Sequence, residues 1–351
     1  MEIVRAKAPA RVSFAGGGTD TEPYMSMYGG CVISCTINKY SYVTLRPNNT
    51  GHINIESLDL GSSVRYSMDS PPPFDGKLDL AKVSISKLMD VTERTGIDVV
   101  TSSEVPPGSG LGTSSTMMVA LIAAIKEYTG MKLSKYEIAH LAYKFEREDL
   151  GLRGGHQDQY AAAFGGFNFI EFSKGGVLVT PLRLPDDVLN ELQLNLLLCY
   201  TGENHISANI IEDQSLNVSN GRIDTIDGMH MQVELATEMK NHLMKGFVEE
   251  FGRMLGVAWN YKKKMSSKIS NDNIDAMYEL AVRNGALGGK LLGAGAGGYL
   301  LLFVPPERQG AVKWALTAAG GQFSDLKFDF GGCQSWSVGA SEVYRQLVSL
   351  S

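Results

Sequence analysis

The chain has 351 residues, of which 44% are hydrophobic and 20% are charged, and this composition is typical of a globular protein that is long enough for two domains. Its net charge of -6 does not favour binding to nucleic acid or to an anionic membrane, because both are negatively charged. An anionic substrate would therefore have to be held by local cations.

In the first third of the sequence, runs of β-branched and aromatic residues are separated by the turn-forming residues Gly, Asn and Ser. This pattern predicts strands joined by turns. Two helices are expected after it, and the second opens with the capping box Ser134-Lys-Tyr-Glu137. The expected strands are 10–15, 31–37, 40–45, 52–56, 64–66 and 97–102, and the expected helices are 116–128 and 134–149.

Between the last of these strands and the first helix lies EVPPGSGLGTSST, residues 104–116. Three glycines in five residues expose main-chain amides, and hydroxyl side chains then lead into a helix, which predicts a loop that holds nucleotide phosphates. A Walker loop would require a lysine here, and a dinucleotide fingerprint would require a third glycine at Thr113, so neither pattern fits. The expected nucleotide-binding residues are Pro107, Gly108, Ser109, Gly110, Leu111, Gly112, Thr113, Ser114 and Ser115.

The second half mixes strands with longer helices, which predicts an α+β fold with helices layered on a sheet in each domain. A polar, Pro-containing stretch at 182–191 marks the expected boundary, giving domains 1–185 and 186–351. The remaining elements are expected as strands at 165–172, 192–199 and 299–304 with short strands to about 339, helices at 223–245, 247–264, 274–284 and 308–318, and a Gly-rich turn at 293–298.

Three segments together resemble the signatures of the GHMP kinases, the family of galactokinase, homoserine kinase, mevalonate kinase and phosphomevalonate kinase. They are APARVSFAGGGTD at 8–20, the loop at 104–116, and KLLGAGAGGYLLLF at 290–303. The resemblance covers nearly the whole chain. It implies a kinase that uses ATP and Mg²⁺, with a mixed N-terminal sheet containing a left-handed β-α-β unit and a C-terminal ferredoxin-like α/β sandwich.

The resemblance also implies catalytic and metal-binding residues. Asp158 matches the family aspartate that faces the acceptor hydroxyl, either as a base or as an orienting group, and Arg11 would lie against it and the transferred phosphate. Ser114 and Glu146 are the expected magnesium ligands, with Glu148 as the competing carboxylate. Ser114 could instead act as a helix cap.

The expected substrate-binding residues are Gly17, Gly18, Thr19, Asp20, Arg153, His156 and Gly295. Gly17 and Gly18 replace a Glu-His pair of galactokinases, which argues against galactose. The motif FAGGGTD resembles the corresponding motif of the heptose kinase branch. Enzymes of that branch phosphorylate D-glycero-D-manno-heptose 7-phosphate at the anomeric hydroxyl. A fucokinase-like or other C1 sugar kinase of the GHMP family is the alternative, and an inactive sensor that binds ATP and sugar is a remote one. His156 could contact sugar or simply pack.

The remaining expectations concern location and assembly. No N-terminal stretch combines basic residues with a long apolar run, and no apolar segment approaches the roughly 18 residues that span a bilayer. We therefore expect a cytoplasmic enzyme, monomeric or homodimeric, that binds small molecules. Its four cysteines lack metal-ligand spacing and are expected to be reduced thiols.

Overall fold

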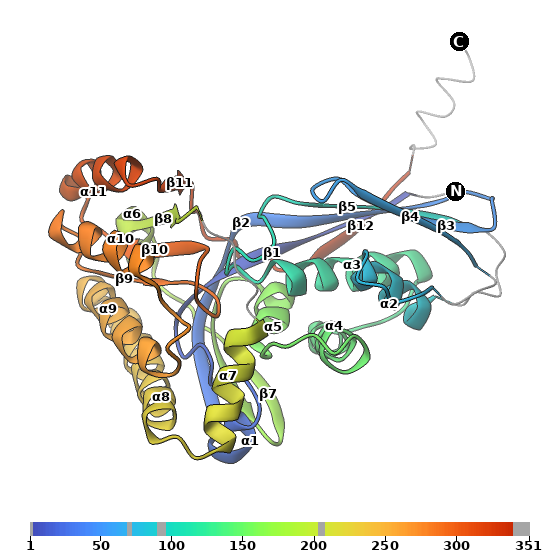
Figure 1. Cartoon of the computed structure of the whole chain (residues 1–351). Helices are drawn as coiled ribbons and strands as arrows, with labels where there is room; N and C mark the ends of the chain where they lie inside the picture. The colour runs from blue at the N-terminus through green and yellow to red at the C-terminus, as the bar shows by residue number, and fades with distance from the viewer. Residues whose placement is uncertain (1–2, 69–71, 90–95, 203–207, 340–351) are drawn as a thin grey trace, which may run out of the picture.

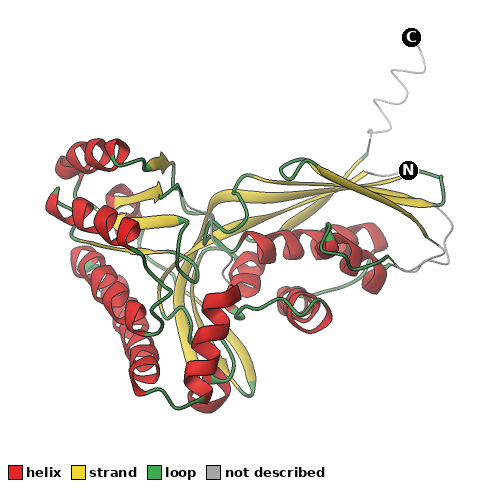
Figure 2. Cartoon of the chain, in the orientation of Figure 1, coloured by secondary structure: helices red, strands yellow, loops and turns green. Residues whose placement is uncertain are grey.

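The computed structural model describes residues 3–68, 72–89, 96–202 and 208–339. Figure 1 shows two sheets, with long strands of the first extending to the right and a smaller sheet at the upper left. Figure 2 shows that helices lie against both sheets. The mixed fold predicted from the sequence is confirmed.

The first sheet has eight strands in the order β12-β1-β2-β5-β3-β4, and β6 joins β2 and carries β7. β3 and β5 are parallel while the other pairs are antiparallel, so the sheet is mixed. Its strands are β1 (Ile3–Ala15), β2 (Gly30–Pro47), β3 (His52–Ser57), β4 (Ser62–Ser67), β5 (Ile97–Ser103), β6 (Phe167–Ser173), β7 (Gly176–Pro181) and β12 (Gln334–Val338).

The long strand β2 replaces the two separate strands that the sequence predicted. Its first part, from Gly30 to Cys35, pairs with β6, and its last part, from Ser41 to Pro47, pairs with β5. The strand stays continuous across the polar residues near Lys39 because β1 pairs with it on both sides of that point.

The helices of the first half cover this sheet on the side of the nucleotide loop. α3 begins directly after the loop and buries most of its length, including every residue from Met118 to Ile125, so it forms the centre of the core. The helical elements are α1 (Tyr24–Tyr28), α2 (Asp79–Leu88), α3 (Thr113–Thr129), α4 (Lys135–Lys144), the π-helical turn η1 (Phe145–Asp149) and α5 (Gln157–Phe164).

The second sheet has the order β11-β8-β10-β9 with antiparallel neighbours. Numbered along the chain this order is 4-1-3-2, which is that of a ferredoxin-like unit, as expected. Its strands are β8 (Leu196–Tyr200), β9 (Gly288–Leu291), β10 (Tyr299–Phe303) and β11 (Gln322–Ser324), and its helices are α6 (Asp186–Asn195), α7 (Ala208–Ser219), α8 (Ile223–Met244), α9 (Val248–Lys264), α10 (Asp272–Arg283) and α11 (Pro306–Ala318).

Several element predictions are confirmed and others need correction. The capping box forms, with both the Ser134 and the Glu137 side chains bonded to the backbone of the other. The helix expected at 134–149 ends as α4 at Lys144 and continues as η1. The polar stretch at 182–191 contains the start of α6, and the strand expected from 192 begins at Leu196.

Cys31, Cys35, Cys199 and Cys333 are free thiols. Among the described residues, no helix is both long enough and apolar enough to cross a membrane.

Candidate active site

The loop before α3 depends on its glycines. Gly108, Gly110 and Gly112 have φ angles of 75°, 83° and 77°, in the left-handed region where a side chain would be strained. The loop therefore turns sharply and leaves the amides at the start of α3 without a side-chain cap. Free amides at a helix N-terminus are suited to phosphate oxygens.

The Gly-rich turn of the second half supports this loop from outside. A Cβ atom on Gly110 would lie 2.5 Å from the carbonyl oxygen of Leu292, and one on Gly293 would lie 2.5 Å from the Cα of Gly110. The amide of Tyr299 donates to the carbonyl of Ser109 at 3.1 Å. Two glycine-rich segments from different halves of the chain thus pack directly against each other through their backbones.

A cavity of about 690 Å³ opens over the loop. On the side of β3 and α2 its lining is largely apolar and includes Ile55, Leu60, Phe74, Leu78, Met117 and Leu121. On the side of α5, α9 and β9 its lining is polar and includes Arg11, Asp20, Gln157, Asp158, Lys262 and Lys290. The phosphate loop lines the same cavity, so a base could lie on the apolar side and a polar acceptor on the other.

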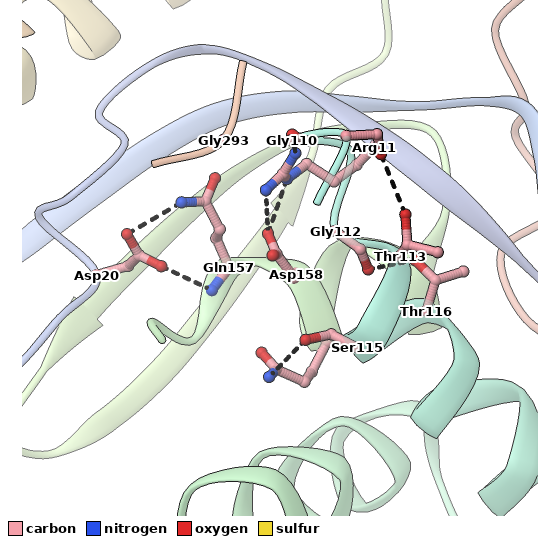
Figure 3. A network of polar contacts seen from close by, with 12 residues as sticks. Arg11, Asp20, Gly110, Gly112, Thr113, Ser115, Thr116, Gln157, Asp158 and Gly293 are labelled. Atoms are coloured by element: carbon pink, nitrogen blue, oxygen red, sulfur yellow. Dashed lines mark hydrogen bonds and ion pairs between the residues drawn. The ribbon is translucent and has the colours of Figure 1, made fainter. Parts of the chain in front are cut away.

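Asp158 and Arg11 meet at the polar side of the loop (Figure 3). The Arg11 Nε donates to Asp158 Oδ1 at 2.7 Å, and Nη1 donates to the carbonyl of Gly110 at 2.7 Å. Arg11 is 4% exposed and Asp158 is 21% exposed, so the carboxylate keeps access to the cavity. A carboxylate fixed in this way can accept a hydrogen bond from a bound hydroxyl.

Glu146 lies on η1, completely buried under the start of α3. Its Oε1 accepts from Ser114 at 2.7 Å, and its Oε2 accepts from Ser115 at 2.7 Å and from Gln159 at 2.6 Å. Glu148, the competing carboxylate, is exposed, and neither Glu146 nor Glu148 is among the residues that line the cavity.

This arrangement fits Mg²⁺. The described residues contain no group of three or more His, Cys, Asp or Glu side chains that could hold a metal alone. Mg²⁺ commonly needs one or two protein oxygens beside substrate phosphates, and the Glu146 carboxylate next to the Ser114 hydroxyl offers such a pair. The donor set is therefore suited to a cation that also contacts a nucleotide.

Asp20 is held by Gln157, the residue directly before Asp158 in the chain. The Gln157 amide donates to Asp20 Oδ2 and its side chain donates to Oδ1, both at 3.0 Å, and the Gly18 amide donates to Oδ1 at 3.1 Å (Figure 3). A Cβ atom on Gly155 would lie 2.0 Å from Asp20 Oδ2, so a side chain there would displace the carboxylate. Asp20, Gly17 and Gly18 line the cavity.

Three predicted substrate residues do not line the cavity. Thr19 is buried and donates to the carbonyls of Gly16 and Cys31. His156 stacks on Tyr143 with ring centres 3.6 Å apart, and burial lowers its pKa. Gly295, with φ of 138°, packs against the backbone of Ile269.

Arg153 does line the cavity and is the most exposed of the predicted substrate-binding residues there. Its side chain is 64% exposed and lies 3.8 Å from Glu212 on α7, so it can move toward a ligand at the cavity rim.

The sequence analysis missed two kinds of site residue. Gln157 and Gln159 flank Asp158, and each holds one of the two other carboxylates. Ser13 lies two residues after Arg11 on β1 and also faces the cavity. The period-2 alternation of a strand could have identified Ser13, because alternate residues share a face.

Two family models match parts of the chain, and several known proteins match it over most of its length. Residues 79–166 match the model of the GHMP kinases N terminal domain, and residues 239–322 match that of the GHMP kinases C terminal domain. A D-glycero-alpha-D-manno-heptose 7-phosphate kinase from Campylobacter jejuni is 38% identical over 96% of this chain and 100% of its own length.

Two further relatives show the range of substrates. The crystal structure of a D-glycero-D-manno-heptose 1-phosphate kinase from Bacteroides thetaiotaomicron has a TM-score of 0.81 and 35% identity, covering 96% of this chain and 100% of that one. An L-fucokinase/L-fucose-1-P guanylyltransferase from Bacteroides fragilis is 30% identical over 89% of this chain and 35% of its own longer sequence.

Proposed function

Because the chain belongs to the GHMP kinase family, whose members use ATP as phosphate donor, we propose that it phosphorylates the anomeric C1 hydroxyl of D-glycero-D-manno-heptose 7-phosphate and yields the 1,7-bisphosphate. One observation carries this proposal. The glycine loop, the Arg11–Asp158 pair and the anchored Asp20 all line one cavity. A nucleotide and a polyol could therefore meet there.

Each part of the site has a proposed role. The amides between Gly108 and Ser115 bind phosphate oxygens, and Ser114 and Glu146 would hold Mg²⁺, which screens charge on the phosphates when bound. Asp158 accepts the hydrogen bond of the C1 hydroxyl and orients its oxygen toward the γ-phosphorus. The new C1 O–P bond forms as the bond to the β,γ-bridging oxygen breaks, ADP leaves, and the hydroxyl proton passes to Asp158 or to solvent.

The polar side of the cavity is suited to a sugar as phosphate acceptor. Asp20 can bind sugar hydroxyls, and Gly17 and Gly18 leave space where galactokinases carry larger polar residues. The names of two relatives support a heptose phosphate, although one name gives a 7-phosphate and the other a 1-phosphate. A C1 kinase acting on the 7-phosphate accounts for both the hydroxyl-binding carboxylates and the cations of the cavity. Use of ATP also supports the cytoplasmic location expected from the sequence.

The test is ATP consumption across a panel of sugars and sugar phosphates, with phosphorus NMR to locate the new ester. The heptose 7-phosphate should exceed the unphosphorylated heptose by roughly 100-fold in kcat/KM, a difference of about 2.7 kcal/mol, because a site built for an anion loses strong contacts without it. Equal or better turnover of fucose or galactose would overturn the heptose assignment. It would instead favour a fucokinase-like or other C1 sugar kinase.

A further inference from the structure

Two lysines of the cavity are buried without an anion. Lys262 on α9 is 3% exposed, and its Nζ donates to the carbonyl of Gly293. Lys290 on β9 is 1% exposed, and its Nζ donates to the carbonyl of Phe14 at 3.1 Å. Among the described residues, neither ammonium group lies within salt-bridge distance of a carboxylate, although both line the cavity.

Their surroundings disfavour the charged form. Burial, with a smaller effect from the positive charge of Arg11, lowers the pKa of Lys262 to about 8, while Asp20 and Asp158 oppose the shift. Burial, together with the charges of Lys262 and Arg11, lowers the pKa of Lys290 well below its usual value. Replacing such lysines with apolar residues would normally favour folding, so their presence needs another explanation.

A third polar group points to what they bind. The hydroxyl of Ser13 is buried, lacks a hydrogen-bond partner among the described residues, and belongs to a side chain that lines the same cavity. A Cβ atom on Gly17 would lie 3.8 Å from both this hydroxyl and the Gln157 side-chain nitrogen, so there is space in front of it. Among the described residues this hydroxyl has no partner and each ammonium group donates to one carbonyl, so donors remain for an anion bound in the same cavity.

We propose that Lys262, Lys290 and Ser13 form a binding site for one phosphate group on the acceptor side of the cavity, next to Arg11. Gly293, whose carbonyl accepts from Lys262, lies close to Gly110 and Arg11 (Figure 3). The phosphate is either that of the sugar substrate or the phosphoryl group in transfer. The inference rests on the proposed function, because both groups belong to its substrates.

The first experiment measures stabilisation by inorganic phosphate. Thermal unfolding is followed against phosphate concentration, with ADP and Mg²⁺ present throughout, for the wild type, Lys262→Met, Lys290→Met and Ser13→Ala. Lys263→Met is the matched control, because Lys263 lies on the same helix but pairs with Asp275 at 3.1 Å. Each lysine variant should bind phosphate roughly tenfold or more weakly, since it loses a charge-assisted hydrogen bond, while the control should match the wild type.

The second experiment separates the two sources of the phosphate. A non-hydrolysable ATP analogue with Mg²⁺ replaces ADP in the wild-type titration. If inorganic phosphate still stabilises the protein, the site takes the phosphate of the sugar, and Lys262→Met should lose most of the preference for phosphorylated over free sugar. If the analogue abolishes the effect, the site takes the phosphoryl group in transfer, and both sugars should lose turnover equally.

A third measurement needs no variant. Because phosphate favours the charged form of Lys262, whose pKa is lowered to about 8, its binding to the wild type above that pH should take up protons, which calorimetry in buffers of different ionisation enthalpy detects. The proposal is overturned if phosphate does not stabilise the wild type, if it stabilises both lysine variants equally well, or if no proton is taken up. Phosphate binding without turnover of any sugar phosphate would instead contradict the proposed function alone.

Discussion

Arg11 on β1 and Asp158 on α5 are separated by 147 residues in the chain and form an ion pair of 2.6 Å. The same guanidinium also donates to the carbonyl of Gly110 in the phosphate loop. One arginine therefore fixes the position of the carboxylate relative to the loop. The reacting groups of a phosphoryl transfer need this kind of fixed geometry.

Replacing Asp158 by Asn should lower kcat by about 100-fold or more and leave ATP affinity within a few-fold, because the substitution affects the acceptor hydroxyl and not the nucleotide. Steady-state kinetics and nucleotide titration measure the two quantities. Asp224→Asn, at an exposed position of α8, is the control. A folded Asp158→Asn protein with wild-type turnover would show that the residue has no role in the reaction.

The Ser114–Glu146 contact predicts which carboxylate binds Mg²⁺. Ser114→Ala and Glu146→Gln should raise the magnesium concentration for half-maximal activity more than they raise the sugar KM. Glu148→Gln should change neither, because that side chain is exposed, whereas Glu146 accepts a hydrogen bond from Ser114. Magnesium titrations at saturating ATP test this, and a response confined to Glu148→Gln would assign the metal to the other glutamate.

Gly17 offers a matched pair of substitutions. A Cβ atom at this position meets its nearest neighbours at 3.8 Å, an ordinary contact, so Gly17→Ala should retain most activity. Gly17→Glu should reduce kcat/KM for the sugar phosphate by bulk and charge repulsion while ATP binding is largely spared. Comparable losses in ATP affinity and sugar kcat/KM would mean that Gly17 supports the fold and not the acceptor pocket.

The buried lysines predict a pH dependence. Lys262, with its pKa lowered to about 8, binds an anion when protonated, so its contribution is present below that pH and is lost as the pH rises through it. Arg11 and Lys290 favour the neutral form, and Asp20 and Asp158 favour the charged form. We expect kcat/KM for the sugar phosphate to fall above about pH 8, and Lys262→Arg to remove this fall because arginine stays charged. An unchanged profile in Lys262→Arg would assign the titration to another group.

The sequence predicted the parts of the site whose chemistry is local. The glycine loop and the start of α3 follow from the closely spaced glycines and the hydroxyl residues after them. The strand around Arg11 follows from its apolar neighbours. It did not predict α5, α2 or α7. α5 has only eight residues and follows two glycines, so it does not give the pattern of a buried helix.

The sequence also did not predict that Lys262 and Lys290 are buried. Lys262 is followed by two more lysines on α9, and such a run usually indicates a solvated helix face. The helix buries one face against the sheet and turns Lys262 into it, whereas Lys263 is one-third exposed. The partner of a side chain depends on which elements pack together, and that information lies in contacts between distant segments.

The close approach of Gly110 and Gly293 has a consequence for biosynthesis. The ribosome releases the phosphate loop well before the turn that supports it, so a nascent chain holds the loop sequence without its final packing. We therefore expect the first half of the chain to bind ATP weakly while it lacks this turn. Tight nucleotide binding should require the packing of Gly293 against Gly110. We expect stalled ribosome-bound chains to retain nucleotide after β10 has emerged and not before.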